Sequence, residues 1–288
     1  MAKTYDRAQE DVGNFAMLEH VNLWQPDQRL ATLFYIVGLE LTRDPFLMVG
    51  LENMWVNIGR NQVHLPSQGT QRLRGSIGLV LPDLARVEAA LQGVSEALAD
   101  TEFTFTAAND RIEATCPWGN RFICHAPAEE FGPADLSVAY LDFDVPKGTA
   151  AGISRFYTEI MGARAELSAR NGSPSAKVWA GPHQHLHFTE TDGEIPAYDG
   201  HHFQIYISDF SGPYDKLMDM DLITMESNQH EWRFKNIVDP DTGEVLYEVE
   251  HEVRSVTNPL YSRPLINRNP VQRNTNYRRG HDGFPGTI

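Results

Sequence analysis

The sequence predicts an α+β fold of four tandem βαβββ units, with mixed sheets curled around clefts that suit a metal or a small ligand. Four stretches alternate apolar and polar residues as strands do, and several of them end in Pro-Asp or Ser-Asp. Their lead residues are His20, Ser76, Tyr140 and His202, which subtraction of the numbers places 56, 64 and 62 residues apart. Each stretch precedes a helical run and further short strands, and a regular period of this kind indicates repeated units.

The first two predicted units follow this order closely. Unit one, residues 16–66, has a strand at 18–27, a helical run at 28–38, and strands at 40–44, 53–59 and 61–66. Unit two, residues 74–127, has a strand at 75–84, a helix with apolar residues at helical spacing at 85–99, and strands within 103–110, 111–120 and 121–127.

The last two predicted units repeat the pattern. Unit three, residues 136–191, opens with a strand at 136–146, continues with a helix at 152–163, and has later strands at 175–181 and 184–191. Unit four, residues 200–252, has a strand at 201–210, a helix at 212–220, and strand segments within 222–227, 231–243 and 244–252.

We therefore expect two domains and a tail. The first domain covers residues 1–130, the second covers 131–253, and an arm rich in Pro, Arg and Asn covers 254–288. The arm has no pattern that would give it a core of its own. Its basic character on an acidic body favours an ordered arm that lies on the surface or reaches a partner subunit, and a homodimer is a possible assembly.

Bulk composition excludes several function classes. The net charge of −15 disfavours nucleic acid and anionic membranes as partners. The sequence has no apolar run long enough to span a membrane, and the polar first residues do not resemble a signal peptide. Cys116 and Cys124 are the two cysteines, too few for a disulfide framework. These features favour a cytoplasmic protein with reduced thiols that acts on a small molecule.

The units resemble those of the vicinal oxygen chelate superfamily, which includes glyoxalase I, extradiol ring-cleaving dioxygenases and bleomycin-binding proteins. The resemblance rests on EHVNLWQPD with FYIVGLEL in unit one, FYTEIMGA in unit three, and HFQIYISDF with FKNIVDPDTGEVLYEVEHE in unit four. It covers residues 16 to about 252. It implies the fold more strongly than the reaction, because this fold serves many chemistries.

The resemblance implies metal ligands on the first and last strands of two paired units. Carried over by position, these are His20 and His64 in unit one and His202 and Glu248 in unit four. Counting from the DPDTG turn also reaches Tyr247, and a carboxylate is the better ligand of the two. The set suits a divalent ion such as Fe²⁺, Mn²⁺, Ni²⁺, Co²⁺ or Zn²⁺.

Unit pairing decides whether these residues meet. Pairing unit one with unit four, and unit two with unit three, gathers all four expected ligands in one cleft. The second cleft would then hold Ser76, Tyr140, His187 and either Ile123 or His125, a poor ligand set. We interpret that cleft as vestigial, structural or a binding pocket.

The resemblance implies a metal that binds two adjacent substrate oxygens. Glyoxalase-like lyase or isomerase chemistry through a stabilised enediolate is then expected, with Glu248 (or Glu250) moving the proton. Ring cleavage with ferrous iron and a metal-free binding or resistance protein are the alternatives. Trp55, Tyr206 and Tyr247 are candidate pocket residues, although each also fits an ordinary core position.

Overall fold

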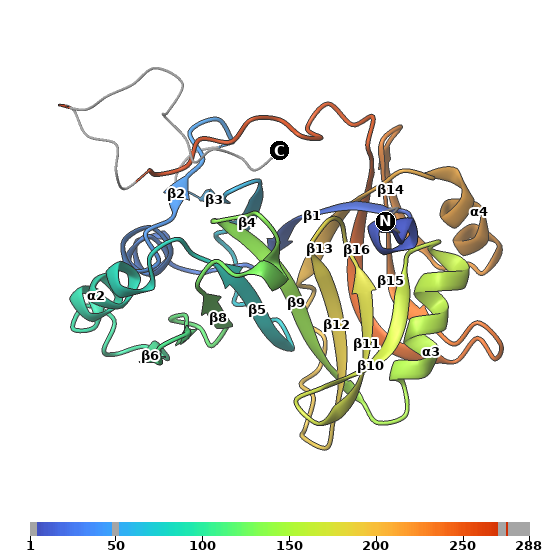
Figure 1. Cartoon of the computed structure of the whole chain (residues 1–288), viewed down its shortest axis with the longest axis horizontal. Coiled ribbons are helices and arrows are strands. Elements are labelled where there is room, and N and C mark those ends of the chain that lie inside the picture. Colours follow the sequence, from blue (N-terminus) through green and yellow to red (C-terminus); the bar gives the residue numbers. More distant parts are fainter. Residues whose placement is uncertain (1–4, 48–51, 270–274, 276–288) are drawn as a thin grey trace, which may run out of the picture.

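The computed structural model describes residues 5–47, 52–269 and 275, and within them the chain forms two mixed sheets of eight strands each (Figure 1). One sheet has the order β14-β15-β16-β13-β1-β4-β3-β2, and the other has the order β10-β11-β12-β9-β5-β8-β7-β6. The predicted α+β class and the repeated βαβββ order are confirmed. Neither sheet is strongly curled, so the expected curling around a deep cleft is not met.

The first half of the chain contains units one and two. Unit one follows the short helix η1 (Arg7–Glu10) and consists of β1 (Phe15–Asn22), α1 (Gln28–Ala31), the π-helical turn η2 (Thr32–Gly38), β2 (Thr42–Arg43), β3 (Asn53–Ile58) and β4 (Asn61–Pro66). Unit two consists of β5 (Gly75–Val80), α2 (Leu84–Val94), β6 (Thr104–Ala107), β7 (Arg111–Thr115) and β8 (Arg121–His125).

The second half contains units three and four. Unit three follows η3 (Glu129–Phe131) and consists of β9 (Ser137–Pro146), α3 (Ala150–Arg155), the π-helical turn η4 (Phe156–Ile160), β10 (Ala165–Arg170), β11 (Ser173–Trp179) and β12 (His185–Thr191). Unit four consists of β13 (His202–Ile207), α4 (Ser211–Asp219), β14 (Ile223–Asn228), β15 (Glu231–Val238) and β16 (Val245–Ser255).

Each sheet joins units from opposite halves of the chain. In the outer-unit sheet, β1 of unit one lies antiparallel to β13 of unit four. In the inner-unit sheet, β5 of unit two lies antiparallel to β9 of unit three. The predicted pairing of unit one with unit four is therefore confirmed. Both sheets cross the boundary expected near residue 130, so a division there separates the halves of the sequence and not the two sheets.

The two sheets pack through their apolar faces. Phe143 of the inner-unit sheet has its ring centroid 5.7 Å from that of Phe203 in the outer-unit sheet. Because alternate residues of a strand face opposite ways, the neighbours of Phe203 at His202 and Gln204 point away from this core. The polar face of the outer-unit sheet is thus the face turned away from the other sheet.

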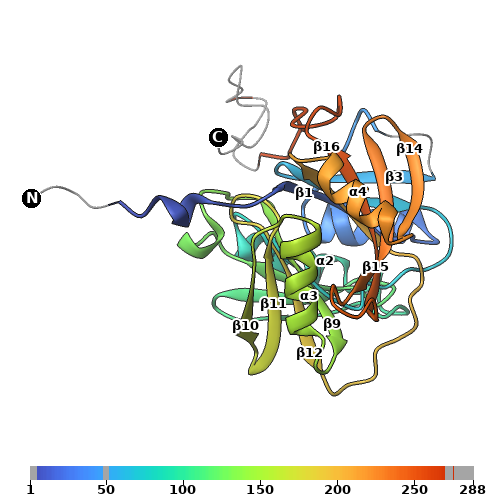
Figure 2. The same ribbon diagram turned by 90° about the vertical axis from the view of Figure 1, so that its right-hand side faces the viewer.

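The helices lie at two ends of this core, α2 at one and α3 with α4 at the other (Figure 1), and Figure 2 faces the end that carries α3 and α4. The helix α2 packs against η2 at one end, and α3 with η4 and α4 pack together at the other. The repeated Phe-Tyr pair explains the helix positions, since Phe34, Tyr35, Phe156 and Tyr157 are all fully buried. The helices α1 and α2 begin at side-chain caps: Asp27 accepts hydrogen bonds from Arg29 and Leu30, and Asp83 accepts one from Arg86. No helix in the described part of the chain is long and apolar enough to cross a membrane.

The first part of the arm is ordered against the outer-unit sheet, as the sequence favoured. After β16 the chain runs across the molecule toward β2 (Figure 1). The ring of Tyr261 lies 4.9 Å from that of Tyr206, and Arg263 forms an ion pair of 2.7 Å with the fully buried Asp44. Asn267 bonds both the N–H and the carbonyl of Gly59. The arm therefore straps unit four to unit one. Residues 270–274 and 276–288, which the arm prediction also covers, lie outside the described residues.

Candidate metal centre

Strand register places a set of polar side chains on one face of the outer-unit sheet. Direct partners across the strands form two neighbouring rows, Gln62–His20–Gln204–Glu252 and His64–Asn22–His202–Glu250. Residues of one parity share a face, so both rows point away from the apolar core. Residues that lie up to 232 positions apart in the sequence are thereby brought to one surface.

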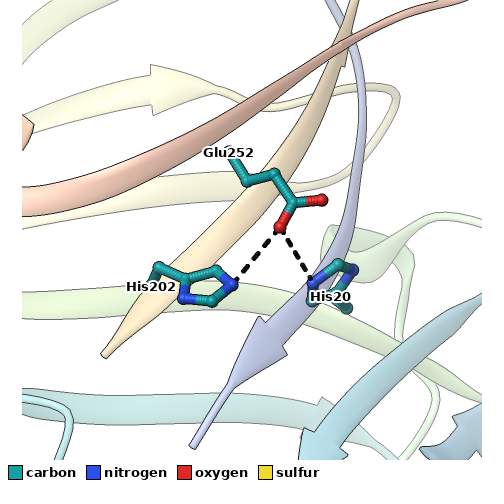
Figure 3. Close-up of side chains that lie close together, drawn as sticks. All are labelled: His20, His202 and Glu252. Atoms are coloured by element: carbon teal, nitrogen blue, oxygen red, sulfur yellow. Dashed lines mark ion pairs between the residues drawn. The ribbon is translucent and has the colours of Figure 1, made fainter. Parts of the chain in front are cut away.

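Three of these side chains converge (Figure 3). Within the described residues, His20, His202 and Glu252 form the one group of three or more histidine, cysteine or acidic side chains whose ligand atoms all lie within 4.8 Å of one another. Glu252 Oε2 lies 3.3 Å from His202 Nε2 and 3.9 Å from His20 Nε2. The two lead histidines, expected to share a site, do come together.

The chemistry of this group fits a divalent cation. The Nε2 atoms of His20 and His202 are buried and make no regular hydrogen bond within the described structure. A buried polar atom that lacks a partner is costly, and coordination of a cation would satisfy both nitrogens together. Two imidazoles and one carboxylate are also the donor set that non-haem ferrous enzymes use, with other coordination positions left open.

A bulge in β1 orients His20. Leu18 pairs with Ile205 and His20 pairs with Gln204, so Glu19 is an extra residue in the ladder. The extra residue brings the Glu19 carboxylate beside the ring, where Oε2 lies 2.5 Å from His20 Nδ1. A proton on Nδ1 shared with Glu19 leaves the Nε2 lone pair directed at Glu252 and His202.

Replacement of Glu19 by glutamine should weaken metal binding about 10- to 100-fold, because the amide orients His20 without the negative charge that raises its basicity. Competition with a chelator of known affinity, measured on the metal-loaded protein, checks this. Glu19→Ala should weaken binding further. Equal affinity in all three proteins would show that the bulge plays no part in the site.

Two arginines hold Glu252 in its ionised form. Arg233 Nη2 lies 2.6 Å from Glu252 Oε2, and Arg254 Nη2 lies 2.5 Å from Oε1. Burial by itself would raise the pKa of Glu252, but His202, His20 and the two arginines outweigh it and hold the pKa well below its usual range. The carboxylate is therefore charged and fixed in place, as a ligand requires, and it is a weak proton acceptor.

His64 lies beside the group but is not a member of it. Its ring centroid is 6.0 Å from that of His20, its ring stacks on Trp55 at 3.7 Å, and its Nε2 lies 2.5 Å from Asn53 Oδ1. Burial, followed by the proximity of His20 and His202, lowers the pKa of His64 to about 2, so the ring is neutral. His64, the fourth expected ligand, is therefore an uncharged neighbour of the three converging side chains.

The carboxylate that lies beside the two histidines is Glu252, and not the Glu248 that the sequence favours. Glu248, the expected ligand and proton-transfer residue, forms an ion pair of 2.8 Å with Lys235 and is not in the group. Glu252 occupies the position instead, four residues further along the same face of β16. Sequence parity correctly joins Glu248, Glu250 and Glu252 on one face, but only the register of β13 against β16 places Gln204 opposite Glu252. The β15–β16 pair has two register shifts, so a fixed number of residues counted from the DPDTG turn does not locate the residue that faces the histidines.

The three expected pocket aromatics separate into two groups. Trp55 has its ring 5.0 Å from that of His20, and Tyr206 follows Gln204 on the same face of β13, so both lie at the site. Tyr247 lies on the opposite face of β16, with Arg74 over its ring at 4.3 Å and Phe143 and Phe188 beside it. Tyr247 is therefore a core residue, which was the alternative to a pocket position for this side chain.

The equivalent positions of the inner-unit sheet lack this donor set. Its register mirrors that of the outer-unit sheet, so Tyr140 corresponds to His20, Ser76 to His202 and Ile123 to Glu252. Gly78 stands where the first sheet has Gln204, and a Cβ there would lie 2.3 Å from the Tyr140 ring. An aromatic ring fills the space that the cluster occupies in the other sheet, which fits the expectation of a second face without metal.

His187 on this second face should make the protein acid-labile. Burial, then Arg170, His185 and Lys177, lower its pKa from 6.5 to about 2, so it stays neutral in the fold while the unfolded chain takes up a proton. The contribution of neutral His187 to the free energy of unfolding is complete above pH 6.5. It is lost as the pH falls below that value, by about 1.4 kcal/mol per pH unit. Urea unfolding of the metal-free protein between pH 7 and about 5 measures how the free energy of unfolding falls with pH. This fall should be less steep for His187→Gln than for the unmodified protein. Parallel slopes would contradict this.

Comparison with known proteins supports the fold but gives no close relative. No protein-family model matches the chain, and no curated protein sequence matches it. Among solved structures, glyoxalase I from Zea mays is similar with a TM-score of 0.58 and 12% identity, over 83% of this chain and 92% of that one. A candidate dioxygenase from Bacillus subtilis subsp. subtilis str. 168 has a TM-score of 0.54 and 13% identity, over 86% and 87% of the two chains.

Identities this low establish a shared fold and no shared activity. The likeness spans most of both chains in each comparison, and it agrees with the four repeated units and their two mixed sheets. The chain therefore has a glyoxalase-like fold.

Proposed function

We propose that this protein is a metal-dependent enzyme that binds a small substrate through two adjacent oxygens, and that His20, His202 and Glu252 hold the metal. The observation that carries the proposal is the convergence of these three side chains with both imidazole Nε2 atoms buried and without a regular partner. A bound divalent ion would supply Lewis acidity toward the two oxygens and, as ferrous iron, the redox chemistry needed to use dioxygen.

The donor set favours ring cleavage of a catechol-type substrate over proton-transfer chemistry. Two histidines and one carboxylate match the ferrous oxygenase set. Proton transfer of the lyase type needs a carboxylate with a pKa near the working pH. Here Glu252, Glu250 and Glu248 are paired with Arg233, Arg254 or Lys235, and the pKa of Glu252 is lowered.

The remaining side chains have supporting roles in this proposal. Glu19 orients His20, while Arg233 and Arg254 keep Glu252 ionised. The stacked pair of His64 and Trp55 gives the site a flat neutral wall beside His20, which suits a planar substrate. His64 is uncharged, and its pKa of about 2 makes it a weak proton acceptor, so its role in the proposal is that of a wall beside the metal.

Glyoxalase-like lyase or isomerase activity is the second candidate, and it is favoured by the structural likeness to the maize glyoxalase I. The two reactions differ in their need for oxygen. Purified protein would be analysed for metal, reloaded separately with Fe²⁺, Mn²⁺, Ni²⁺, Co²⁺ and Zn²⁺, and assayed with catechols and with hemithioacetals. Oxygen uptake with catechol in the iron form alone supports ring cleavage, and oxygen-independent turnover of hemithioacetals supports the second candidate. A protein that retains none of these metals is a metal-free binder, and the proposal is then wrong.

A further inference from the structure

Side-chain amides occupy the positions between the candidate metal ligands. Gln204 lies directly across from both His20 and Glu252, and Asn22 lies directly across from His202. Gln62 lies across from His20 on the other side. A molecule seated on the three ligands would therefore cover these amides as well.

These amides are buried, and their polar atoms are largely without partners. Gln204 is 0% exposed, and neither its Oε1 nor its Nε2 has a hydrogen-bond partner in the described residues. The same holds for Asn22 Nδ2 and Gln62 Oε1. A buried unpaired amide destabilises the fold. Its presence is explained if the amide binds a ligand.

Elsewhere in the described residues, buried amides are of both kinds. Gln25 is 0% exposed and also has no partner for its Oε1 or Nε2, whereas Gln184 is fully bonded. Gln184 is 9% exposed, and its side chain accepts from Leu18 N–H and donates to the carbonyls of Leu18 and Val138. Gln184 therefore joins the central strands of the two sheets. Unpaired amides therefore also occur outside the two rows, and what distinguishes Gln204 and Asn22 is their position directly across the strands from His20, Glu252 and His202.

The carboxylates around the group outnumber the guanidinium groups by two. Four carboxylates, from Glu19, Glu231, Glu250 and Glu252, are paired with two guanidinium groups, from Arg233 and Arg254, and with the histidine rings. A divalent cation would neutralise the two negative charges that remain. No surplus cation is then left in this network for an anionic substituent of a substrate.

Given the proposed function, on which this inference rests, we infer that the substrate carries an uncharged hydroxyl or amide group in addition to its two chelating oxygens, and that Gln204 and Asn22 bind that group. Amides offer both donors and acceptors, so they recognise a neutral polar substituent and reject both an apolar one and a carboxylate.

Three catechols of similar shape test this inference by calorimetry on the zinc-loaded protein, which cannot turn them over with oxygen. The probes are 3,4-dihydroxybenzamide, 4-isopropylcatechol and 3,4-dihydroxybenzoate. The benzamide should bind at least about tenfold more tightly than the other two. Gln204→Met should remove the preference for the benzamide over the isopropyl compound, and Asn22→Leu should reduce it. Equal affinities in the unmodified protein, or a preference that survives both substitutions, would overturn the inference.

A second measurement needs neither metal nor ligand. Gln204→Met removes unpaired amide atoms at nearly constant volume, so it should raise the thermal midpoint of the metal-free protein by about 2–4 °C. The matched variant Gln184→Met removes three hydrogen bonds and should lower it. A fall of similar size in both variants would show that Gln204 is bonded in the fold and would end the inference. An unmodified protein that binds no metal would contradict the proposed function. The comparison of Gln204→Met with Gln184→Met does not depend on metal, so it tests the unpaired amides separately.

Discussion

Glu252→Gln is expected to weaken metal binding by more than about 100-fold, because the amide lacks the charge that holds the cation and outer-shell changes alone reach that size. Glu252 is also the buried partner of Arg233 and Arg254, so its neutralisation leaves two half-buried cations without this carboxylate. The measurement is metal content after gel filtration, followed by chelator competition for the affinity.

Glu248→Gln is the matched control for this experiment. Glu248 lies on the same strand and the same face as Glu252, but its carboxylate pairs with the half-exposed Lys235. We expect metal content to be unchanged in this variant. If Glu248→Gln loses the metal and Glu252→Gln keeps it, the ligand expected from the sequence is the right one and the observed cluster is not the site. Unfolding curves of both variants establish that each remains folded.

Arg263→Ala should destabilise the protein by about 3 kcal/mol, since it leaves the buried carboxylate of Asp44 without its charge partner. Burial by itself would raise the pKa of Asp44, but Arg263 and the N–H groups of Leu47 and Phe46 outweigh it and lower the pKa. A group with a lowered pKa stabilises the fold above its unfolded value of 3.8 and loses that contribution as the pH falls below it. Urea unfolding at pH 7 measures the cost.

Two further variants separate the ion pair from general loosening of the arm. Arg60 reaches the same arm through an exposed contact of 3.3 Å to Ser262, so Arg60→Ala should change the stability by less than about 0.5 kcal/mol. Asp44→Asn combined with Arg263→Ala should cost less than Arg263→Ala alone, because the unpaired buried charge is removed. If Arg263→Ala lowers the free energy of unfolding no more than Arg60→Ala does, the attachment of the arm does not depend on the Arg263–Asp44 pair.

The sequence by itself determined the repeated units and the lead histidines. Alternation and helical spacing are local properties, so four βαβββ units and their order follow from short-range patterns. His20 and His202 are readable because each lies on the first strand of its own unit. The Phe-Tyr pairs mark helices for the same reason, since their burial depends on a helix packing on its neighbouring strands.

Only the tertiary structure decided which residues complete the site. Glu252 rather than Glu248 faces the histidines because of the register of β13 against β16, which pairs residues 48 positions apart along the chain. Glu19 reaches His20 through a bulge that a regular alternation does not reveal. The unpaired amides of Gln204 and Asn22, and the arm that binds Asp44, became visible only once four distant strands lay side by side.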